Sequence, residues 1–131
     1  MKYFLLIFFS YVCILANESV LFDNIEWQDN KESKIVQKNW EEAKAYCTDL
    51  SLLGKNDWTL PTIKELQNLV NIRRKKPAID VVFNYTANKN YWTKTPYRHD
   101  SKKAWSINFY RGYTRSALKK EKYYVRCKRS R

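Results

Sequence analysis

Two cysteines, Cys47 and Cys127, constrain the fold of this 131-residue chain more than any other feature. Cys47 lies in a stretch with helical periodicity, and Cys127 lies near the C-terminus in a stretch of alternating polarity. A disulfide between them would join the first helix to the last strand and close nearly the whole domain into one loop, which stabilises by about 4–5 kcal/mol on the chain-entropy model. We therefore expect a single compact domain in an oxidising compartment, and a binding module more readily than an enzyme.

The N-terminus predicts export. The apolar run after Lys2 is too short to span a bilayer comfortably and ends in a small residue, as secretory signal peptides do. We expect residues 1–16 to be cleaved after Ala16, leaving residues 17–131 as one domain; an uncleaved anchor is the alternative. A lipoprotein site at Cys13 is disfavoured because bulky residues precede it. Cleavage removes Cys13, and one disulfide is the simplest expectation for the remaining pair, with two separate buried thiols as the alternative.

The charge balance indicates the kind of partner. The formal net charge is +12, while 16% of the residues are aromatic, so the chain has enough apolar material for a core and is not a disordered basic tail. A basic exported domain favours anionic partners, which include sulfated or uronic polysaccharides, lipopolysaccharide phosphates, extracellular DNA and anionic lipid. The alternative is a generally basic composition without a specific partner. We expect no specific nucleic-acid binding and no membrane span after signal cleavage.

Two capping boxes mark two helices. An Asn-x-x-Glu box at residue 39 precedes a helix predicted over residues 40–52, with Gly54 as its stop. A Thr-x-x-Glu box at residue 62 precedes a helix predicted over residues 63–73, since Pro77 disfavours further helix. The apolar stripes that these helices bury are expected to be Trp40, Ala43, Cys47 and Leu50 in the first, and Ile63, Leu66, Leu69 and Val70 in the second.

The other segments predict short strands and loops. The clearest alternation is in residues 104–110, where Trp105, Ile107 and Phe109 face one way, and Arg111 with Gly112 supplies the next turn. Strands are expected at residues 20–22, 25–27, 91–95, 104–110 and 123–128, with Asp23 and Asn24 as the turn between the first two, and loops at 28–33 and 77–89. In the last strand, Val125 and Cys127 take the inward face and Arg126 takes the other. The further side chains expected in the core are Trp58, Trp92, Trp105, Ile79, Val81, Val82 and Phe83.

The order of short motifs resembles one protein family. The motifs are Ile25-Glu-Trp-Gln-Asp29, Trp40-Glu-Glu-Ala-Lys-Ala-Tyr-Cys47, Asp57-Trp-Thr-Leu-Pro-Thr62 with Glu65-Leu66, Tyr91-Trp-Thr-Lys-Thr-Pro96, Trp105-Ser-Ile-Asn-Phe109 with Gly112, and Val125-Arg-Cys127. Together they resemble the bacterial family named for the C-terminal domain of the collagen-like adhesin Lcl, over about residues 21–128. The departures are mild: Thr59 stands where the family more often has Arg, and Thr93 with Lys94 where it has two serines.

The resemblance implies a fold and a general role. It implies an α+β, C-type-lectin-like domain in which two helices pack on a small, twisted, mainly antiparallel sheet. Cys47 and Cys127 are then the helix-to-strand bridge of that fold. It also suggests adhesion, since the namesake domain is associated with glycosaminoglycan binding, but a fold does not assign a ligand to this chain.

Catalytic and metal-binding signals are weak. The sequence has neither the Glu-Pro-Asn or Gln-Pro-Asp motif nor the Trp-Asn-Asp motif of calcium-dependent lectins, and it has no second His or spare Cys for zinc. His99 is the single histidine, and its neighbours Asp100 and Ser101 lie within one loop, without the separation that a catalytic triad draws on. We therefore expect no enzymatic activity, no cofactor and no metal.

Clusters of basic residues are the best candidate site. Arg forks suit sulfate and phosphate, and the nearby Tyr110, Tyr113, Tyr123 and Tyr124 offer faces for sugar rings. The predicted ligand-binding basic surface comprises Arg73, Arg74, Lys75, Lys76, Arg111, Arg115, Lys119, Lys120 and Lys122. Further basic clusters are Lys102 with Lys103, and Arg126 and Lys128 with Arg129 and Arg131. Solvated, solubilising charge is the alternative reading of each cluster.

These observations predict an exported, lectin-like binding module that serves in adhesion or captures an anionic polysaccharide. The alternative is a structural or protein-interaction subunit of the cell envelope that docks an acidic cell-surface protein. Export leaves three locations open: the periplasm, the cell surface and the medium.

Overall fold

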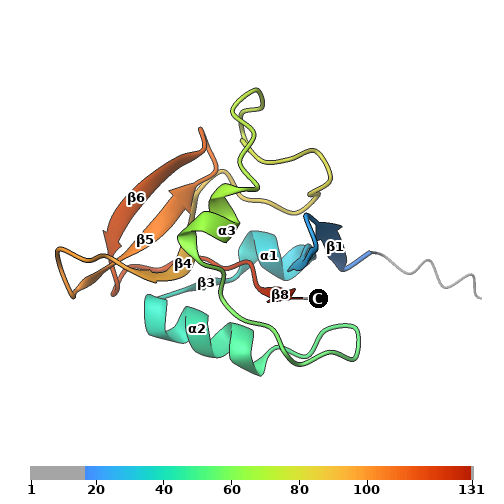
Figure 1. The fold of residues 1–131 in the computed structure, drawn as a ribbon, viewed down its shortest axis with the longest axis horizontal. Helices are drawn as coiled ribbons and strands as arrows, with labels where there is room; N and C mark the ends of the chain where they lie inside the picture. The colour runs from blue at the N-terminus through green and yellow to red at the C-terminus, as the bar shows by residue number, and fades with distance from the viewer. Residues whose placement is uncertain (1–16, 131) are drawn as a thin grey trace, which may run out of the picture.

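The computed structural model describes residues 17–130, so the predicted signal peptide and Arg131 lie outside the described residues. The described chain is α+β, as predicted, but it has three helices and two sheets instead of two helices on one sheet (Figure 1). The helices are α1 (Lys31–Ile35), α2 (Trp40–Asp49) and α3 (Ile63–Gln67). The strands are β1 (Ser19–Phe22), β2 (Ile25–Gln28), β3 (Gln37–Lys38), β4 (Asn90–Pro96), β5 (Lys103–Asn108), β6 (Tyr113–Leu118), β7 (Tyr123–Tyr124) and β8 (Lys128–Ser130).

The smaller sheet brings the two ends of the domain together. Its order is β1-β2-β8, and both pairings are antiparallel. Asp23 and Asn24 connect β1 to β2 with positive φ angles of 52° and 62°, which these two residue types tolerate in a tight hairpin turn. The predicted turn is therefore confirmed. The pairing of Trp27 with Lys128 places the C-terminal strand beside the N-terminal hairpin.

The larger sheet has the order β3-β7-β4-β5-β6. Its pairings are antiparallel except that of β4 with β7, which is parallel. The turn between β5 and β6 needs Gly112, which has a φ of 84° and whose hypothetical Cβ would lie 2.5 Å from Cγ1 of Val70. This turn is thus packed tightly against the segment that follows α3.

Capping boxes begin all three helices, at Asn30, Asn39 and Thr62. The two predicted starts are confirmed, but both predicted helices end early. α2 ends at Asp49 instead of residue 52 because Leu50 adopts an extended conformation. α3 ends at Gln67 instead of residue 73 because the backbone beyond it pairs with a distant segment, as Asp80 N donates to Leu69 O at 2.9 Å.

The helix α1 was not predicted, since residues 28–33 were expected to form a loop. Its five residues are too few to show a helical period, and it is identified by its caps alone. Asn30 Oδ1 accepts a hydrogen bond from Ser33 N at 3.2 Å, and Ser33 Oγ accepts one from Asn30 N at 3.2 Å. The buried Ser33 then fixes the helix against the core.

Two apolar clusters form the core, and neighbouring residues of β4 point into different ones. Trp92 packs with Trp40, Cys47, Trp58 and Val125, whereas Tyr91 lies in the cluster of Trp27, Leu66, Ile79, Phe83, Ile107 and Phe109. Since successive strand residues point to opposite faces, the large sheet is covered on both sides, with α2 on one and α3 on the other (Figure 1).

Three residues predicted for the core lie elsewhere. Val81 and Val82 are 63% and 44% exposed, because the side chain of Asp80 accepts a hydrogen bond from Val82 N and turns this segment outward. Trp105 is only half-buried, and its ring stands edge-on to that of Tyr97 with the centroids 5.2 Å apart.

The predicted disulfide is present. Cys47 and Cys127 are fully buried, bonded through their sulfurs and 5.4 Å apart at Cα. However, the strand predicted over residues 123–128 is divided into β7 and β8, and Cys127 lies between them. The strand is interrupted because both backbone polar groups of Cys127 bond to Gln28. Cys127 N donates to Gln28 Oε1 at 3.1 Å, and Gln28 N donates to Cys127 O at 2.9 Å.

Candidate functional site

The structure divides the basic residues into two classes, those with acidic partners and those without. Among the described residues, the ion pairs use Lys44, Lys55, Arg126, Lys128 and Arg129. Acidic residues are scarce in the second half of the sequence, where Asp80, Asp100 and Glu121 are the only ones after Glu65. Most basic residues of that half therefore have little opposite charge close by in the sequence.

Arg126 belongs to the class with acidic partners, and the prediction that it lies in a basic surface cluster was wrong. Its side chain is fully buried. One guanidinium nitrogen donates to Gln28 O at 2.5 Å and to Asp29 Oδ1 at 3.2 Å, and the other donates to Tyr85 O at 2.5 Å and Thr86 Oγ1 at 2.7 Å. A buried charge requires such partners, so Arg126 serves the structure and is closed to a ligand.

Lys128 and Arg129 are also engaged internally. Lys128 is buried and lies 2.9 Å from a carboxylate oxygen of Glu65, while Arg129 donates to Asp57 at 2.6 Å and to Glu26 at 2.8 Å. Burial alone raises the pKa of Glu26, but hydrogen bonds from Arg129, Lys55 and Ser19 outweigh it and lower the pKa to about 2. These pairs attach β8 to its neighbours.

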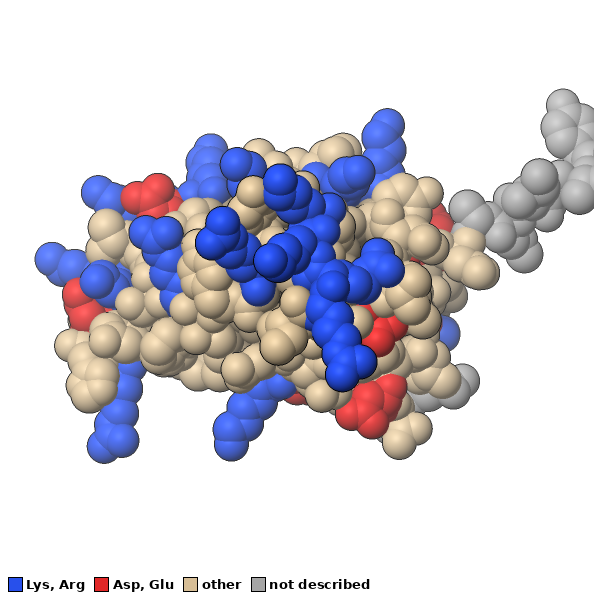
Figure 2. Space-filling model, turned by 90° about the horizontal axis from the view of Figure 1, so that it is seen from above, with Lys and Arg blue, Asp and Glu red and all other residues tan. Residues whose placement is uncertain are grey.

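The nine predicted ligand-binding residues fall in the second class. Within residues 17–130, none of them forms an ion pair, and all are exposed except the half-buried Lys119. Figure 2 looks down on the side of the molecule where the loop after α3 projects in Figure 1, and Lys and Arg side chains gather at its centre. The charges of the nine predicted residues are therefore available to an external anion.

One group of these cations surrounds Tyr110, in the turn between β5 and β6. The amine of Lys76 lies 5.3 Å and the guanidinium of Arg111 5.6 Å from the centre of the Tyr110 ring. A hydrogen bond from Lys76, then its charge and those of Arg111 and Lys75, lower the pKa of the Tyr110 hydroxyl. We call Lys75, Lys76, Tyr110 and Arg111 the tip cluster; tertiary structure brings its two sequence segments together.

A second group lies at the opposite end of the β5–β6 hairpin. Lys102, Lys119 and Lys120 surround a hollow of about 540 Å³ whose fourth lining residue is Leu118. Lys119 N donates to Lys102 O at 2.8 Å, which holds the two segments side by side. We call the three lysines the base cluster. Lys102 was not among the residues predicted to bind ligand; the observed register, in which Lys103 pairs with Leu118, places it opposite Lys119.

Trp40 packs beneath the base cluster. The amines of Lys44 and Lys119 lie 3.7 and 4.3 Å from the centre of its ring, and its indole nitrogen donates to Thr93 O at 2.8 Å. Trp40 is itself buried. These contacts hold Lys119 more firmly than a freely solvated lysine would be held.

The remaining predicted residues are not all on the same surface. Arg115 is exposed on β6, between the two clusters, and lines a hollow of about 360 Å³ with Lys103, Tyr123 and the acidic Glu121. Within residues 17–130, Arg115 and Glu121 form no ion pair. Lys122 lines a different hollow, of about 340 Å³, with Lys89 and Tyr124. The predicted basic surface is thus resolved into the tip cluster, the base cluster and Arg115 between them, with Lys122 set apart. Arg73 and Arg74 are exposed in the same loop, directly before the tip-cluster residues Lys75 and Lys76.

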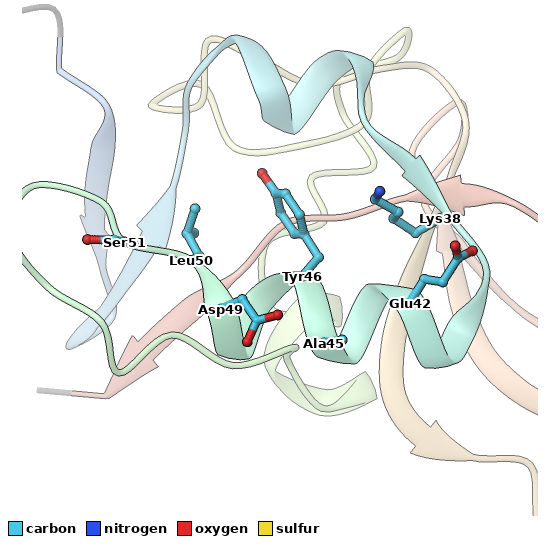
Figure 3. Close-up of a pocket in the computed structure, with 7 residues that line it drawn as sticks. All are labelled: Lys38, Glu42, Ala45, Tyr46, Asp49, Leu50 and Ser51. Atoms are coloured by element: carbon cyan, nitrogen blue, oxygen red, sulfur yellow. The ribbon is translucent and has the colours of Figure 1, made fainter.

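A further hollow, of about 430 Å³, lies between α2 and β3 (Figure 3). Its lining mixes Lys38, Glu42, Tyr46 and Asp49 with small and apolar residues. The Tyr46 hydroxyl donates to Glu32 and accepts from Gln28 Nε2, and burial followed by the bond to Glu32 raises its pKa. Glu42 is occupied by the capping box of α2. These two polar groups are therefore engaged in holding α1 and α2.

A metal site, a catalytic histidine and a membrane-spanning helix would each indicate a different kind of function. Within residues 17–130, no group of three or more His, Cys, Asp or Glu side chains is arranged to hold a metal ion. His99 is exposed, and its ring lies edge-on to that of Tyr97 with centroids 5.5 Å apart. No helix in that range is long and apolar enough to cross a membrane.

Comparison with known proteins adds a family. Residues 22–129, nearly all of the described chain, match the family described as the Lcl C-terminal domain. No curated protein matches the chain.

Proposed function

We propose that this chain, which belongs to the Lcl C-terminal domain family, is an exported binding module that captures anionic glycans of the glycosaminoglycan type, in adhesion or retention at a surface. One observation carries the proposal: the cations of the tip and base clusters and Arg115 are exposed or half-buried and form no ion pair with any described residue, whereas Arg126, Lys128 and Arg129 are paired internally. Unpaired surface cations in clusters attract a polyanion because its binding adds opposite charge that the protein does not supply.

The chemistry of the two clusters suits sulfated and carboxylated sugars. The guanidinium of Arg111 offers a planar pair of donors that matches a sulfate or carboxylate, while the lysines act as point charges. Tyr110 and the exposed Tyr113 add aromatic faces beside these charges. A module that uses charge and ring faces in this way needs no metal ion to hold its ligand.

The fold and the location form part of the proposal. A C-type-lectin-like fold is supported by the mainly antiparallel larger sheet, by the helices on its two sides and by the disulfide from α2 to the C-terminal segment. Export is supported by the same disulfide, since such bonds persist in oxidising compartments and are rare in the cytosol.

A second candidate is the docking of an acidic envelope protein. It is favoured by Ile72, which is 74% exposed directly beside Arg73. An exposed aliphatic side chain next to four cations fits a protein surface with apolar and acidic residues better than it fits a polysaccharide.

The test is retention of the oxidised protein on immobilised heparin, eluted with increasing NaCl. The variant neutralises Arg73, Arg74, Lys75 and Lys76 with glutamine. The matched control makes the same charge change at the exposed Lys31, Lys34, Lys64 and Lys94, which lie outside the proposed surface. We expect clearly earlier elution of the first variant than of the control, because local and not net charge sets the contact.

Equal elution of the two variants would show that heparin senses only net charge and would contradict the proposal. The acidic-protein candidate predicts another pattern, in which Ile72→Ser weakens capture of the partner and leaves heparin retention unchanged.

A further inference from the structure

Strand β6 is an edge strand whose two ends carry the two basic clusters. The order β3-β7-β4-β5-β6 leaves one side of β6 unpaired within the sheet. The pairing of Asn108 with Tyr113 marks the end beside the tip cluster, and the pairing of Lys103 with Leu118 marks the end beside the base cluster. The clusters are therefore separated by the full length of β6.

That length is set by the register of the hairpin. Strand β6 has six residues, and at the rise of an antiparallel strand its first and last Cα atoms lie about 17 Å apart. The clusters lie beyond these ends, so a ligand that contacts both must be at least this long. A single sulfate group or a disaccharide is too short for this distance.

The interval between the clusters also suits an anionic chain. Residues 111–120 contain no acidic residue. Within them, Arg115 is exposed on β6 and Tyr113 is 47% exposed. Positive charge and an aromatic face therefore continue along the strand from one cluster to the other.

Protection of the sheet edge accounts for only part of this pattern. Charged side chains on an edge strand discourage pairing with another chain, which explains Arg115. It does not explain the tip and base clusters, which lie beyond the ends of β6. Nor does it explain Tyr113, since an exposed aromatic residue favours strand pairing.

We propose that the edge of β6 is a track for a linear sulfated polysaccharide, which contacts the tip cluster, Arg115 and the base cluster at once. This inference rests on the function proposed above. It assigns the ligand a minimum length, because contact with the second cluster becomes intramolecular once the first is bound. Short anionic sugars bind one cluster at a time and gain nothing from the other.

The test is a length series of heparin fragments, from disaccharide to octasaccharide, titrated into the oxidised protein at constant salt. We expect the dissociation constant to fall by about a hundredfold or more once a fragment spans both clusters, which is the lower end of the gain that linked sites provide. In the variant Lys102→Gln/Lys119→Gln/Lys120→Gln, the octasaccharide should lose this advantage while the disaccharide still binds. A control variant that neutralises the exposed Lys89, Lys94 and Arg98 should keep the higher affinity for the octasaccharide.

Because Lys119 packs on Trp40, the variant Lys102→Gln/Lys120→Gln repeats the test without disturbing that contact. The octasaccharide contains several disaccharide segments, and this number alone raises its apparent affinity. If fragments bind but the affinity of the octasaccharide rises only by this factor, the track is overturned and the proposed function stands. The track is also overturned if the base variants keep the full length dependence. If no fragment binds at any length, both proposals fail. Equally tight binding of a polyglutamate of matched charge would overturn the assignment to a polysaccharide.

Discussion

The guanidinium of Arg126 lies 3.2 Å from the carboxylate of Asp29, and both side chains are buried. The same carboxylate accepts hydrogen bonds from the backbone nitrogens of Asn84 and Tyr85, each at 2.9 Å. This pair therefore joins three segments that are distant in the sequence: the end of β2, the loop before β4 and the strand-like segment that contains Cys127. It also decides that Arg126 is unavailable to a ligand.

Replacing Arg126 with Met should strongly destabilise the domain. The variant leaves the Asp29 carboxylate buried without its counter-ion, and breaking a buried pair in this way destabilises by about 3–5 kcal/mol. The free energy of unfolding in urea measures the effect. A loss below about 1 kcal/mol would contradict the structural role, and heparin retention of any folded fraction should be unchanged because Arg126 is buried.

Acid should weaken the attachment of β8 through Glu26. The pKa of Glu26 is lowered from 4.5 to about 2 in the folded protein, because hydrogen bonds from Arg129, Lys55 and Ser19 outweigh the effect of burial. Because the pKa of Glu26 is lower in the folded than in the unfolded protein, its ionised carboxylate stabilises the fold above about pH 4.5. This stabilisation is lost as the pH falls from about 4.5 to about 2.

The measurement is the free energy of unfolding as a function of pH, for the wild type and for Glu26→Gln. The variant should show a shallower decline between pH 5 and pH 2. Parallel curves for the two proteins would mean that Glu26 does not carry this dependence.

Loss of the disulfide should lower stability without abolishing the surface clusters. Cys47 and Cys127 are 80 residues apart in the sequence, and closing a loop of this size stabilises by about 4–5 kcal/mol on the chain-entropy model. Urea denaturation with and without a reducing agent measures the difference. The double variant Cys47→Ala/Cys127→Ala should resemble the reduced wild type and should be insensitive to the reductant.

Gly112→Ala should destabilise more than Gly54→Ala. Both glycines have positive φ angles, 84° and 73°, so both substitutions incur the left-handed penalty of about 1–2 kcal/mol. Only at Gly112 would the new Cβ meet another atom, Cγ1 of Val70 at 2.5 Å; at Gly54 it would meet nothing within 4 Å. Thermal unfolding of the two variants compares them directly, and equal losses would mean that the close contact is relieved by local movement.

Much of the local structure could be predicted because its determinants lie within a few residues. The capping boxes at Asn39 and Thr62 identified where α2 and α3 begin, and Asp23 with Asn24 identified the first hairpin turn. The ends of the same helices could not be predicted. Leu69 pairs with Asp80 because of contacts made across the fold, and no local signal in residues 68–73 indicates that partner.

The candidate site was predictable in its composition but not in its layout. Clusters of Arg and Lys are visible in the sequence, yet Lys102 was left out and Arg126 was wrongly expected on the surface. Alternation in residues 123–128 suggested that Arg126 faces solvent. The end of β2 and the loop before β4 reverse that expectation, since the Arg126 guanidinium donates to Gln28 O, Tyr85 O and Thr86 Oγ1.

The sequence alone determined the family, the two capped helix starts, the pairing of Cys47 with Cys127 and the excess of positive charge, since each depends on residue type and local order. Only the tertiary structure decided which cations remain free. A charge is neutralised by whatever lies beside it in space, and the carboxylate that pairs with Arg126 comes from a residue 97 positions away.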